Sequence, residues 1–568
     1  MTEARPKPPA QRARVGRVIA SSGAQHLVLI ERQPQDARPL CAGDVLVIGV
    51  GRTEPLSGAQ APLCVAAVTA LTVPAPQTDG DADEMMIAEV DLYGTLTKGG
   101  FTRGIDRTPA LGDAVCAASG ADLDCLYADG APVAELTGRP GQRAAIRPDA
   151  LAVGFGIVGA LGSGKSATLA VLVRAMLRAR TGIRPVLLDT HDEYARSFGR
   201  AANVVAPGPG FAPHWLLSFE ELCWALSLAG GPLAGAERVL LAEVVPAARI
   251  RMLQRTGAAA GMPVGLDAPF PYRLTDAISY LDRTAHADPA RVDAAYERLR
   301  ARLGAAAADP RLGVVFGAPA AADTLPQLLA DVFGMGDDGA PMSVVRLGAL
   351  RLGLDRLVAA VLCRLARVIG EGTGGRERVL MLAEDAERYA PGRRLDADGV
   401  AGAERLSRAA VLDLAGAAHA GGVGIGFATA RPSLVDETLL RAVPTLLIHR
   451  LPSETERAAV AGVLPEGSAA TVAGVGTQRP RDCVAVGQGV PAQGRYTMDA
   501  LPAAAVPQRA AAPAPNPSRA GAAADLIGRW RYGADAVPAN AAPRSARPGS
   551  PTSAPPPPVT GLRSVPAA

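Results

Sequence analysis

The N-terminal part of the chain alternates short apolar runs with turn-forming residues. Between residues 14 and 140, the runs GRVIASSGAQHLVLIE, GDVLVIGVG, LCVAAVTALTV and MMIAEVDLYGTL are rich in Val, Ile and Leu, and clusters of Gly, Pro and Asp separate them. This spacing predicts β-strands with no long helix between them. We therefore predict a small β-barrel domain over residues 14–140, preceded by a disordered N-terminus at residues 1–13.

The hydrophobic pattern changes near residue 150. The apolar run ALAVGFGIVG leads into a glycine-rich turn, SATLAVLVRAMLRART then carries apolar residues at helical spacing, and RPVLLDTH is the next buried strand. Strand, turn, helix and strand in this order open a parallel α/β domain. Apolar runs at 377–385, 421–432 and 444–451 predict further strands. The predicted fold class is therefore α/β, with one nucleotide-binding core.

A helical segment interrupts this core, and a tail follows it. LLSFEELCWALSL, AERVLLAEVV and DAAYERLRARLG each carry an apolar stripe, so we predict a helical insertion at 211–310 within a core formed by 141–210 and 311–495. Residues 496–568 are rich in Ala, Pro, Ser and Arg and predict a disordered tail. Its ADLIGRWRYG patch, with Trp530 and Tyr532, either docks on a neighbouring surface or is a solvated linker.

Composition excludes several classes of protein. The formal charge of +3 on 568 residues says little about partners, because a nucleic-acid ligand needs a local basic surface. Seven cysteines without CxxC pairs predict reduced thiols, with neither a disulfide framework nor a zinc site. The apolar run LVAAVLCRLARVIG is interrupted by Arg364 and Arg367, and no signal core follows the N-terminus. We therefore predict a cytoplasmic protein with no membrane partner.

Lysine occurs at only three positions, and one of them lies in the glycine-rich turn IVGALGSGKSAT at 157–168. Gly159, Gly164, Lys165 and Ser166 satisfy the pattern G-x-x-x-x-G-K-[ST], for which the composition predicts roughly 0.004 chance matches over the whole chain. The alternative is a strand-to-helix turn with an incidental lysine.

The residue types of this turn suit phosphate binding. Glycines let successive backbone N–H groups cradle a phosphate at a helix N-terminus. Lys165 is a compact charge on a long stem that reaches the β- and γ-phosphates, and Ser166 would place its hydroxyl on Mg²⁺. The predicted cofactors are ATP and Mg²⁺, and the predicted nucleotide-binding residues are Gly159, Ala160, Leu161, Gly162, Ser163, Gly164, Lys165, Ser166 and Ala167.

A phosphate-binding loop of this kind needs an acidic partner on another strand. The run VLMLAED ends in Glu384 and Asp385. The first carboxylate would hold the metal, and the second would polarise the attacking water. The alternative is a pair of solvated carboxylates at a strand end.

Two other strand ends carry polar residues. VLLDTHDEY places Asp189, His191 and Glu193 after the second strand, where they either face the ligand crevice or form a helix cap and turn. His191 has no second histidine nearby, which argues against a metal-ligand role. FATARPS places Thr429 and Arg431 beside the expected γ-phosphate, or is only a strand that ends at a proline.

Taken together, these segments resemble the HerA-type ATPases of the FtsK/HerA group of ring-forming DNA motors. The resemblance rests on GALGSGKS, LDTHDEY, PHWLLSFEEL, LDAPFPYRLTD, ADPRLGVVF, LMLAEDAERYAP and ATARPSLVDETLL in this order, and it extends to about residue 495. It implies a HAS-barrel-like N-terminal domain and a RecA-like P-loop core with a helical insertion. It also implies a homohexamer with ATP sites between subunits, DNA in its centre, and a nuclease or a defence effector as partner.

The chain departs from the family pattern at three places. Ala430 stands where the family usually has Gln, and Asp385 stands where it usually has Glu. The stretch GAAHAGG at 416–422 lacks the arginine that is common there. Ring ATPases also insert an arginine from the adjacent subunit. The candidates for this role are Arg431, Arg441 and Arg450.

We therefore predict an ATP-dependent DNA translocase or helicase-like motor of the HerA type. Its predicted catalytic residues are Lys165, Glu384, Asp385 and Arg431, and its predicted metal-binding residues are Ser166 and Glu384. One alternative is a nucleotide-binding assembly protein with weak or no hydrolysis, which the residues at 385 and 430 favour. Another is a conjugation- or secretion-type motor that acts on cargo other than DNA.

Overall fold

A computed structural model describes the chain from residue 12 to residue 508. The expected tail beyond this range, with Trp530 and Tyr532, lies outside the described residues, as does the N-terminus through residue 11. The internal ranges that are also outside the description are 23–24, 32–38, 51–61, 74–85, 258–263, 288–292, 318–321, 337–338, 393–400, 419–421, 466–467 and 469–470.

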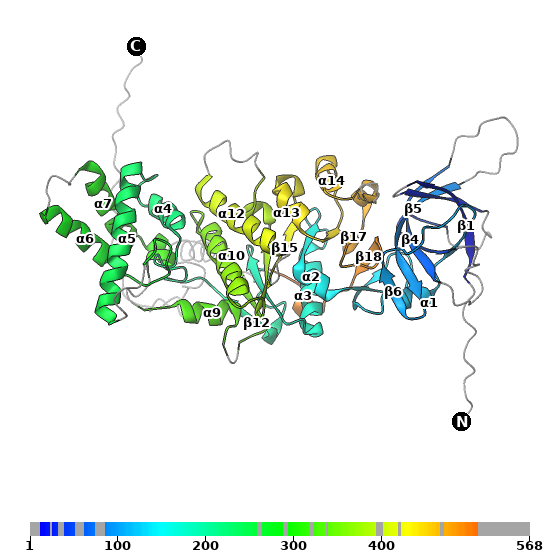
Figure 1. Cartoon of the computed structure of the whole chain (residues 1–568), viewed down its shortest axis with the longest axis horizontal. Helices are drawn as coiled ribbons and strands as arrows, with labels where there is room; N and C mark the ends of the chain where they lie inside the picture. Colours follow the sequence, from blue (N-terminus) through cyan, green and yellow to red (C-terminus); the bar gives the residue numbers. More distant parts are fainter. Residues whose placement is uncertain are drawn as a thin grey trace, which may run out of the picture. The chain divides into compact units, whose positions relative to one another are not determined.

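Six strands of the N-terminal region close into a barrel, as predicted (Figure 1). Their order is β2-β1-β7-β3-β4-β5, and antiparallel pairing of β2 with β5 closes the ring. Val28, Ile48 and Val115 are fully buried inside it. The elements are β1 (Arg14–Ser22), β2 (Gln25–Ile30), β3 (Val45–Gly49), β4 (Leu63–Thr72), β5 (Met86–Thr97), β6 (Gly100–Arg103), which extends β5, β7 (Ala114–Ala117) and helix α1 (Gly120–Leu126).

A second sheet of eleven strands forms the core, in the order β12-β13-β11-β14-β15-β10-β16-β17-β18-β8-β9. The seven strands from β12 to β16 are parallel, and the remaining four continue the sheet in antiparallel fashion. The strands are β8 (Ala131–Leu136), β9 (Arg143–Ile146), β10 (Gly154–Val158), β11 (Ile183–Asp189), β12 (Ala202–Val205), β13 (Met342–Arg346), β14 (Arg378–Glu384), β15 (Val423–Thr429), β16 (Thr445–Ile448), β17 (Asp482–Gly487) and β18 (Gly494–Met498).

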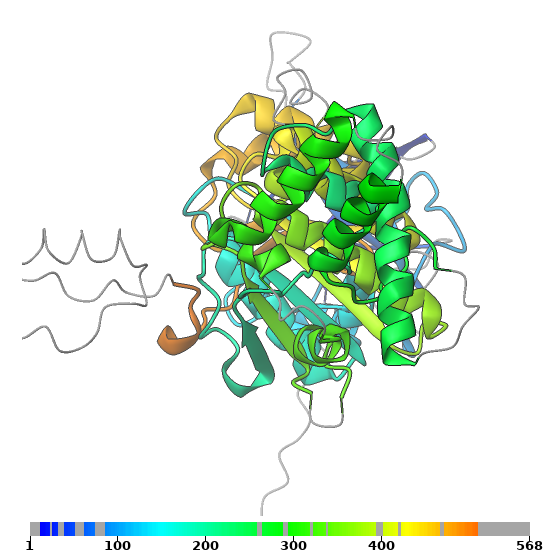
Figure 2. The same ribbon diagram turned by 90° about the vertical axis from the view of Figure 1, so that its left-hand side faces the viewer.

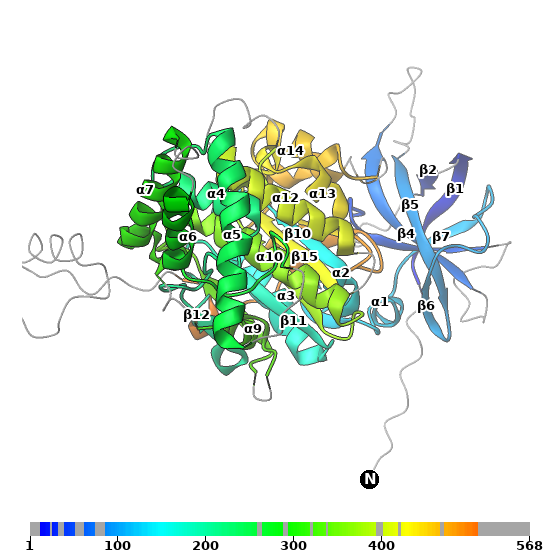
Figure 3. The same cartoon turned by 60° about the vertical axis from the view of Figure 1, so that its left-hand side comes forward.

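Helices cover both faces of this sheet. Along β14, Val379 and Met381 pack in one hydrophobic cluster with α10 and α12, whereas Leu380 and Leu382 pack in another with α3. This alternation follows from the period of two in a strand, and burial on both faces explains why the central strands are apolar throughout. Figure 3 shows α10 and α12 side by side over the sheet. The three helices are α3 (Lys165–Ala179), α10 (Leu354–Gly372) and α12 (Ala401–Ala417).

Between β12 and β13 the chain is helical, and Figure 2 shows these green helices together. The N-terminus of α4 carries a capping box, in which Ser218 and Glu221 bond reciprocally to each other's backbone amides. The helices of this segment are α4 (Phe219–Ser227), α5 (Gly235–Thr256), α6 (Leu274–Ala287), α7 (Ala294–Ala308), α8 (Gly313–Phe316) and α9 (Leu325–Phe333).

The structure differs in detail from the sequence-based expectations. The run ALAVGFGIVG is divided between a short helix and β10, and β18 continues past residue 495 to pair with β8. The other helices are α2 (Pro148–Val153), α11 (Ala386–Tyr389), α13 (Glu437–Ala442) and α14 (Glu454–Ala461), and short 3₁₀ helices lie at Gly199–Ala201, Pro310–Leu312, Pro432–Leu434, Ala473–Thr477 and Ala503–Ala505.

Two expectations from composition concern the cysteines and membrane insertion. All seven cysteines are free thiols, and five of them are buried. None of the helices within the described ranges combines the length and the apolar character needed to cross a membrane.

Candidate nucleotide-binding and catalytic site

The sequence-predicted site residues meet at one edge of the core sheet. Val158, the last residue of β10, pairs with Thr429 at the end of β15, and Glu384 at the end of β14 pairs with Ala428. Only β15 therefore lies between the strand before the glycine-rich loop and the strand with the acidic pair. Because the carboxyl ends of parallel strands share an edge, residues more than 200 positions apart become neighbours.

The glycine-rich loop makes a tight turn into α3. Gly162 and Gly164 have φ values of 73° and 106°, which glycine adopts without strain. Gly164 is the N-cap of α3, and no side chain caps this helix. The first amide groups of α3 are thus available to an anion, and the helix dipole favours negative charge there. Leu161, at the tip of the loop, is 88% exposed, and Ala167 lies in the first turn of the helix.

Lys165 turns back into this loop. Its Nζ donates a hydrogen bond to the carbonyl oxygen of Ala160 at 3.2 Å. Burial lowers the pKa of the ammonium, and the neighbouring carboxylates of Asp385, Glu387 and Glu384 oppose that effect. The ammonium group of Lys165 thus lies at the loop, close to several acidic side chains.

Ser166 and Glu384 meet across the sheet edge. Ser166 Oγ lies 3.4 Å from Glu384 Oε1, which also accepts a hydrogen bond from the Tyr194 hydroxyl at 3.2 Å. Burial raises the pKa of Glu384 to about 8, and the carboxylates of Asp189 and Asp385 add to the shift. The acidic pair thus lies beside the phosphate-binding loop.

The residues at this position fit a Mg²⁺ ion. Glu384 Oε2 is buried and has no hydrogen-bond partner within the described residues. A divalent cation there would stabilise the charged carboxylate, and the oxygens of Glu384 and Ser166 are the ligand type that Mg²⁺ prefers. No cluster of three or more His, Cys, Asp or Glu residues in the described ranges could hold a metal alone.

Asp385 takes an unusual backbone conformation and pairs with a histidine. Its φ is 55°, in the left-handed region. Its Oδ2 lies 2.5 Å from His191 Nε2, at the end of β11. His191 therefore donates to the carboxylate expected to polarise water, a role that the sequence did not indicate.

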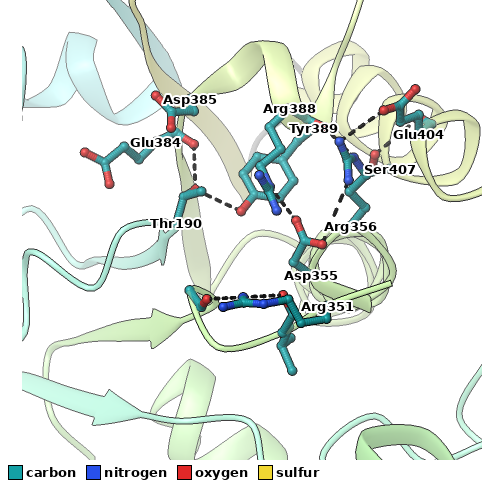
Figure 4. A network of polar contacts seen from close by, with 12 residues as sticks. Thr190, Arg351, Asp355, Arg356, Glu384, Asp385, Arg388, Tyr389, Glu404 and Ser407 are labelled. Atoms are coloured by element: carbon teal, nitrogen blue, oxygen red, sulfur yellow. Dashed lines mark hydrogen bonds and ion pairs between the residues drawn. The ribbon is translucent and has the colours of Figure 1, made fainter. Parts of the chain in front are cut away.

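The tip of β11 also supports the backbone of the acidic pair (Figure 4). Thr190 Oγ1 donates to the carbonyl oxygen of Glu384 at 3.1 Å and accepts from the Tyr389 hydroxyl at 2.9 Å. Asp189 has the structural role that the sequence left open, because its carboxylate accepts hydrogen bonds from the amides of Glu193 and Tyr194. It therefore caps the turn after the strand. Burial raises the pKa of this carboxyl group.

Behind the acidic pair, ion pairs fix the short helix α11. Arg388 Nε lies 2.5 Å from Asp355 Oδ2 on α10, and Asp355 is 1% exposed. Arg356 donates to the carbonyl oxygen of Arg388 at 3.1 Å and pairs with Glu404 on α12 at 3.0 Å. Figure 4 shows this network continuing from Glu384 to α12. A buried carboxylate with an arginine partner locks local geometry, since losing either partner would leave a buried charge unpaired.

The end of β15 provides the other wall of the site. Thr429 Oγ1 donates to Glu387 Oε2 at 2.6 Å, and its carbonyl oxygen accepts from Gly159 N at 3.2 Å. Ala430 has no polar side chain, so it supplies no side-chain hydrogen bond at the expected γ-phosphate position. Arg431 Nε lies 3.7 Å from Glu387 Oε1, and its side chain is 64% exposed.

The other two arginine candidates differ in their environment. Arg441 pairs with Glu437 and donates to the carbonyl oxygen of Gly462, and its side chain is 54% exposed. The carbonyl oxygen of Arg450 accepts from Ala160 N at 2.8 Å, and its Nε is buried without a partner in the described part of the chain. Arg431 is thus the candidate with the most exposed side chain at the strand ends.

Several residues of this site escaped sequence reasoning. Thr190 lies between Asp189 and His191, Tyr194 follows Glu193, and Glu387 follows the acidic pair by two residues, so proximity to a recognised motif was their only signal. Asp355 lies in the first turn of α10, where an acidic residue is also explained by the helix dipole.

The glycine-rich loop, the lysine and the acidic strand end define a P-loop NTPase. Residues 131–366 match the family model described as "Helicase HerA, central domain". This match confirms the resemblance to HerA-type ATPases over that segment, and the α/β P-loop fold predicted from the sequence is present. No curated protein matches the chain in sequence.

Solved structures similar to this chain include VirB4, a plasmid coupling protein and a viral genome packaging NTPase. VirB4 of Thermoanaerobacter pseudethanolicus is 14% identical with a TM-score of 0.47, over 66% of this chain and 98% of that one. The plasmid coupling protein TrwB in complex with the ATP analogue ADPNP is 14% identical with a TM-score of 0.42, over 67% and 93%. The genome packaging NTPase B204 of Sulfolobus turreted icosahedral virus 2 is 13% identical with a TM-score of 0.21, over 30% and 73%.

Proposed function

We propose that this protein is an ATP-hydrolysing motor of the HerA type that moves DNA. The observation that carries the proposal is the 3.4 Å separation of Ser166 Oγ and Glu384 Oε1, which places an acidic strand end beside a phosphate-binding loop. Phosphate binding by Lys165 and the first amides of α3 would hold the triphosphate. Ser166 and Glu384 would hold Mg²⁺, which would neutralise phosphate charge during hydrolysis.

In this proposal Asp385 orients the attacking water and takes up its proton. His191, which donates to Asp385 Oδ2, holds the carboxylate in one orientation. Thr429 and the backbone near Ala430 lie at the end of β15, adjacent to Gly159. An arginine of a neighbouring subunit would complete the charge stabilisation, and we favour Arg431 because its side chain, 64% exposed, is more exposed than that of Arg441, at 54%.

The assembly and the cargo belong to the same proposal. A homohexamer would place each arginine at the site of its neighbour and would surround DNA, and a nuclease or a defence effector would act with it in the cytoplasm. The family match of residues 131–366 supports these assignments. Mass photometry of the full chain with and without a slowly hydrolysed ATP analogue tests the assembly, and a hexamer is the expected mass.

A second function, nucleotide-dependent assembly without turnover, is favoured by one observation. Ala430 offers no side-chain hydrogen bond at the end of β15, where the γ-phosphate is expected. Phosphate release with and without duplex DNA, with Lys165→Ala as the control, decides between the functions. DNA-stimulated release supports the DNA motor, release without stimulation supports a motor with other cargo, and nucleotide binding without release supports the assembly protein.

A further inference from the structure

Arg481 lies against the P-loop in a backbone conformation that arginine rarely adopts. Its φ is 73°, in the left-handed region that glycine enters freely. Its amide donates to the carbonyl oxygen of Ser163 at 3.0 Å, and its own carbonyl accepts from Met498 N at 3.0 Å. The surrounding fold therefore imposes this conformation, and glycine would adopt it with less strain than arginine.

The side chain of Arg481 starts beside the N-terminus of α3. A Cβ atom built on Gly164 would lie 3.0 Å from Arg481 N and 3.6 Å from Arg481 Cγ. Gly164 is the N-cap of α3, the point at which the helix dipole and the amide groups favour an anion. The aliphatic stem of Arg481 thus runs along the anion-binding end of the helix.

The guanidinium of Arg481 contacts no partner in the part of the chain that the structure describes. It makes neither a hydrogen bond nor an ion pair within the described residues, and the side chain is only partly buried. Arg249 and Arg364, by contrast, donate to carbonyl or carboxylate oxygens. The guanidinium therefore contributes no polar contact that would stabilise its own loop within the described residues. Its chemistry, a planar fork of N–H donors, suits a phosphate.

The order of strands indicates which part of a nucleotide this arginine meets. Arg481 immediately precedes β17, and β16 and β17 lie on one side of β10, whereas β15 and β14 lie on the other. Arg481 therefore approaches the loop from the side opposite Glu384, which is the side assigned to Mg²⁺ and the γ-phosphate. The α- and β-phosphates, which are nearer the nucleoside, are therefore the groups that we expect Arg481 to contact.

We propose that Arg481 is a nucleotide-binding residue whose guanidinium donates to α- and β-phosphate oxygens at the P-loop of the same subunit. The proposal rests on the nucleotide site described above and adds to it a residue outside every recognised motif. It also accounts for an arginine at a position where the backbone favours glycine.

Arg481→Gly tests the proposal without threatening the fold, because glycine relieves the left-handed strain. Arg180→Gly is a matched control, since Arg180 is also left-handed, with φ of 50°, but caps the opposite end of the 15-residue helix α3. Calorimetric titration of the full-length proteins with Mg·ADP and Mg·ATP gives the affinities, and thermal melts give the stabilities. We expect both variants to melt at or above the wild-type Tm.

The expected result is that Arg481→Gly weakens both nucleotides by the same factor, roughly tenfold, which is typical for loss of a charge-assisted hydrogen bond. Arg180→Gly should bind like the wild type. Equal affinities of wild type and Arg481→Gly overturn the assignment, and a loss confined to Mg·ATP overturns the α- and β-phosphate contact. A wild-type chain that binds neither nucleotide overturns the proposed function itself, which is a separate and distinguishable failure.

Discussion

Ser166 Oγ at the start of α3 lies 3.4 Å from Glu384 Oε1 at the end of β14, although 218 residues separate them in the chain. The parallel order of β10, β15 and β14 produces this proximity, because all three strands end at one edge. Local sequence patterns identified each half of the site, and the sheet brings the halves together. The two residues therefore link the phosphate-binding loop to the acidic strand.

His191 should act on turnover rather than on binding. His191→Ala removes the donor to Asp385 Oδ2, so we expect kcat for ATP hydrolysis to fall by roughly tenfold or more while the nucleotide affinity stays within twofold. His191→Gln, which keeps a donor at similar reach, should restore part of the rate. His286→Ala is the control, because His286 is an exposed histidine on α6. Equal losses of affinity and kcat would argue for a merely structural role.

Gly159 should not tolerate a methyl group. A Cβ atom there would lie 2.6 Å from His449 Cβ and 2.7 Å from Ser163 Oγ, well inside van der Waals contact. Gly159→Ala should therefore lower the free energy of unfolding by about 1–3 kcal/mol and weaken nucleotide binding, as overpacking does. Gly208→Ala serves as the control because no atom lies within 4 Å of its Cβ position. Denaturant titration measures the free energy of unfolding of the two variants. A Gly159→Ala protein as stable as the wild type would contradict the packing described.

His214 should make stability depend on pH. Burial lowers its pKa to about 4, and Nε2 is bonded to the carbonyl oxygen of Tyr272 at 2.9 Å. Because the folded pKa lies below the unfolded value of about 6.5, its contribution is complete above pH 6.5 and is lost as the pH falls towards 4. The limit of this loss is of the order of 3 kcal/mol.

The comparison that isolates this effect is wild type against His214→Gln, in which the amide keeps the hydrogen bond but does not titrate. The difference between their unfolding free energies should shrink or reverse as the pH falls from 6.5 to 4. A difference that stays constant over this range would show that His214 does not titrate as described.

The sequence predicted those features that depend on local chemistry. The loop at 159–166 and the acidic strand end are visible because their residue types are needed at fixed spacing, and the barrel strands are visible because turn residues separate them. The four- and five-residue strands β12 and β13 were missed, since so short a run carries little periodicity. The helix α5 continues through Pro246, where a sequence rule would end it.

Contacts that depend on strand order could not be predicted. The pairing of His191 with Asp385 requires β11 and β14 to be neighbours in register. The sequence of neither segment identifies the strand beside which it lies. The position of Arg481 likewise depends on the antiparallel extension by β17 and β18, which the apolar pattern did not reveal. The interpretation of Asp189 was left open because a turn cap and a ligand-facing carboxylate share the same sequence signature.

The most direct test of the central claim is the Mg²⁺ dependence of ATP affinity in wild type and in Glu384→Gln. If the loop and β14 form one site, Mg²⁺ should strengthen ATP binding by wild type by roughly tenfold and have little effect on the variant, whose neutral amide is a weak ligand for Mg²⁺. The same Mg²⁺ dependence in both proteins would contradict the claim, because Glu384 would then lie outside the nucleotide site.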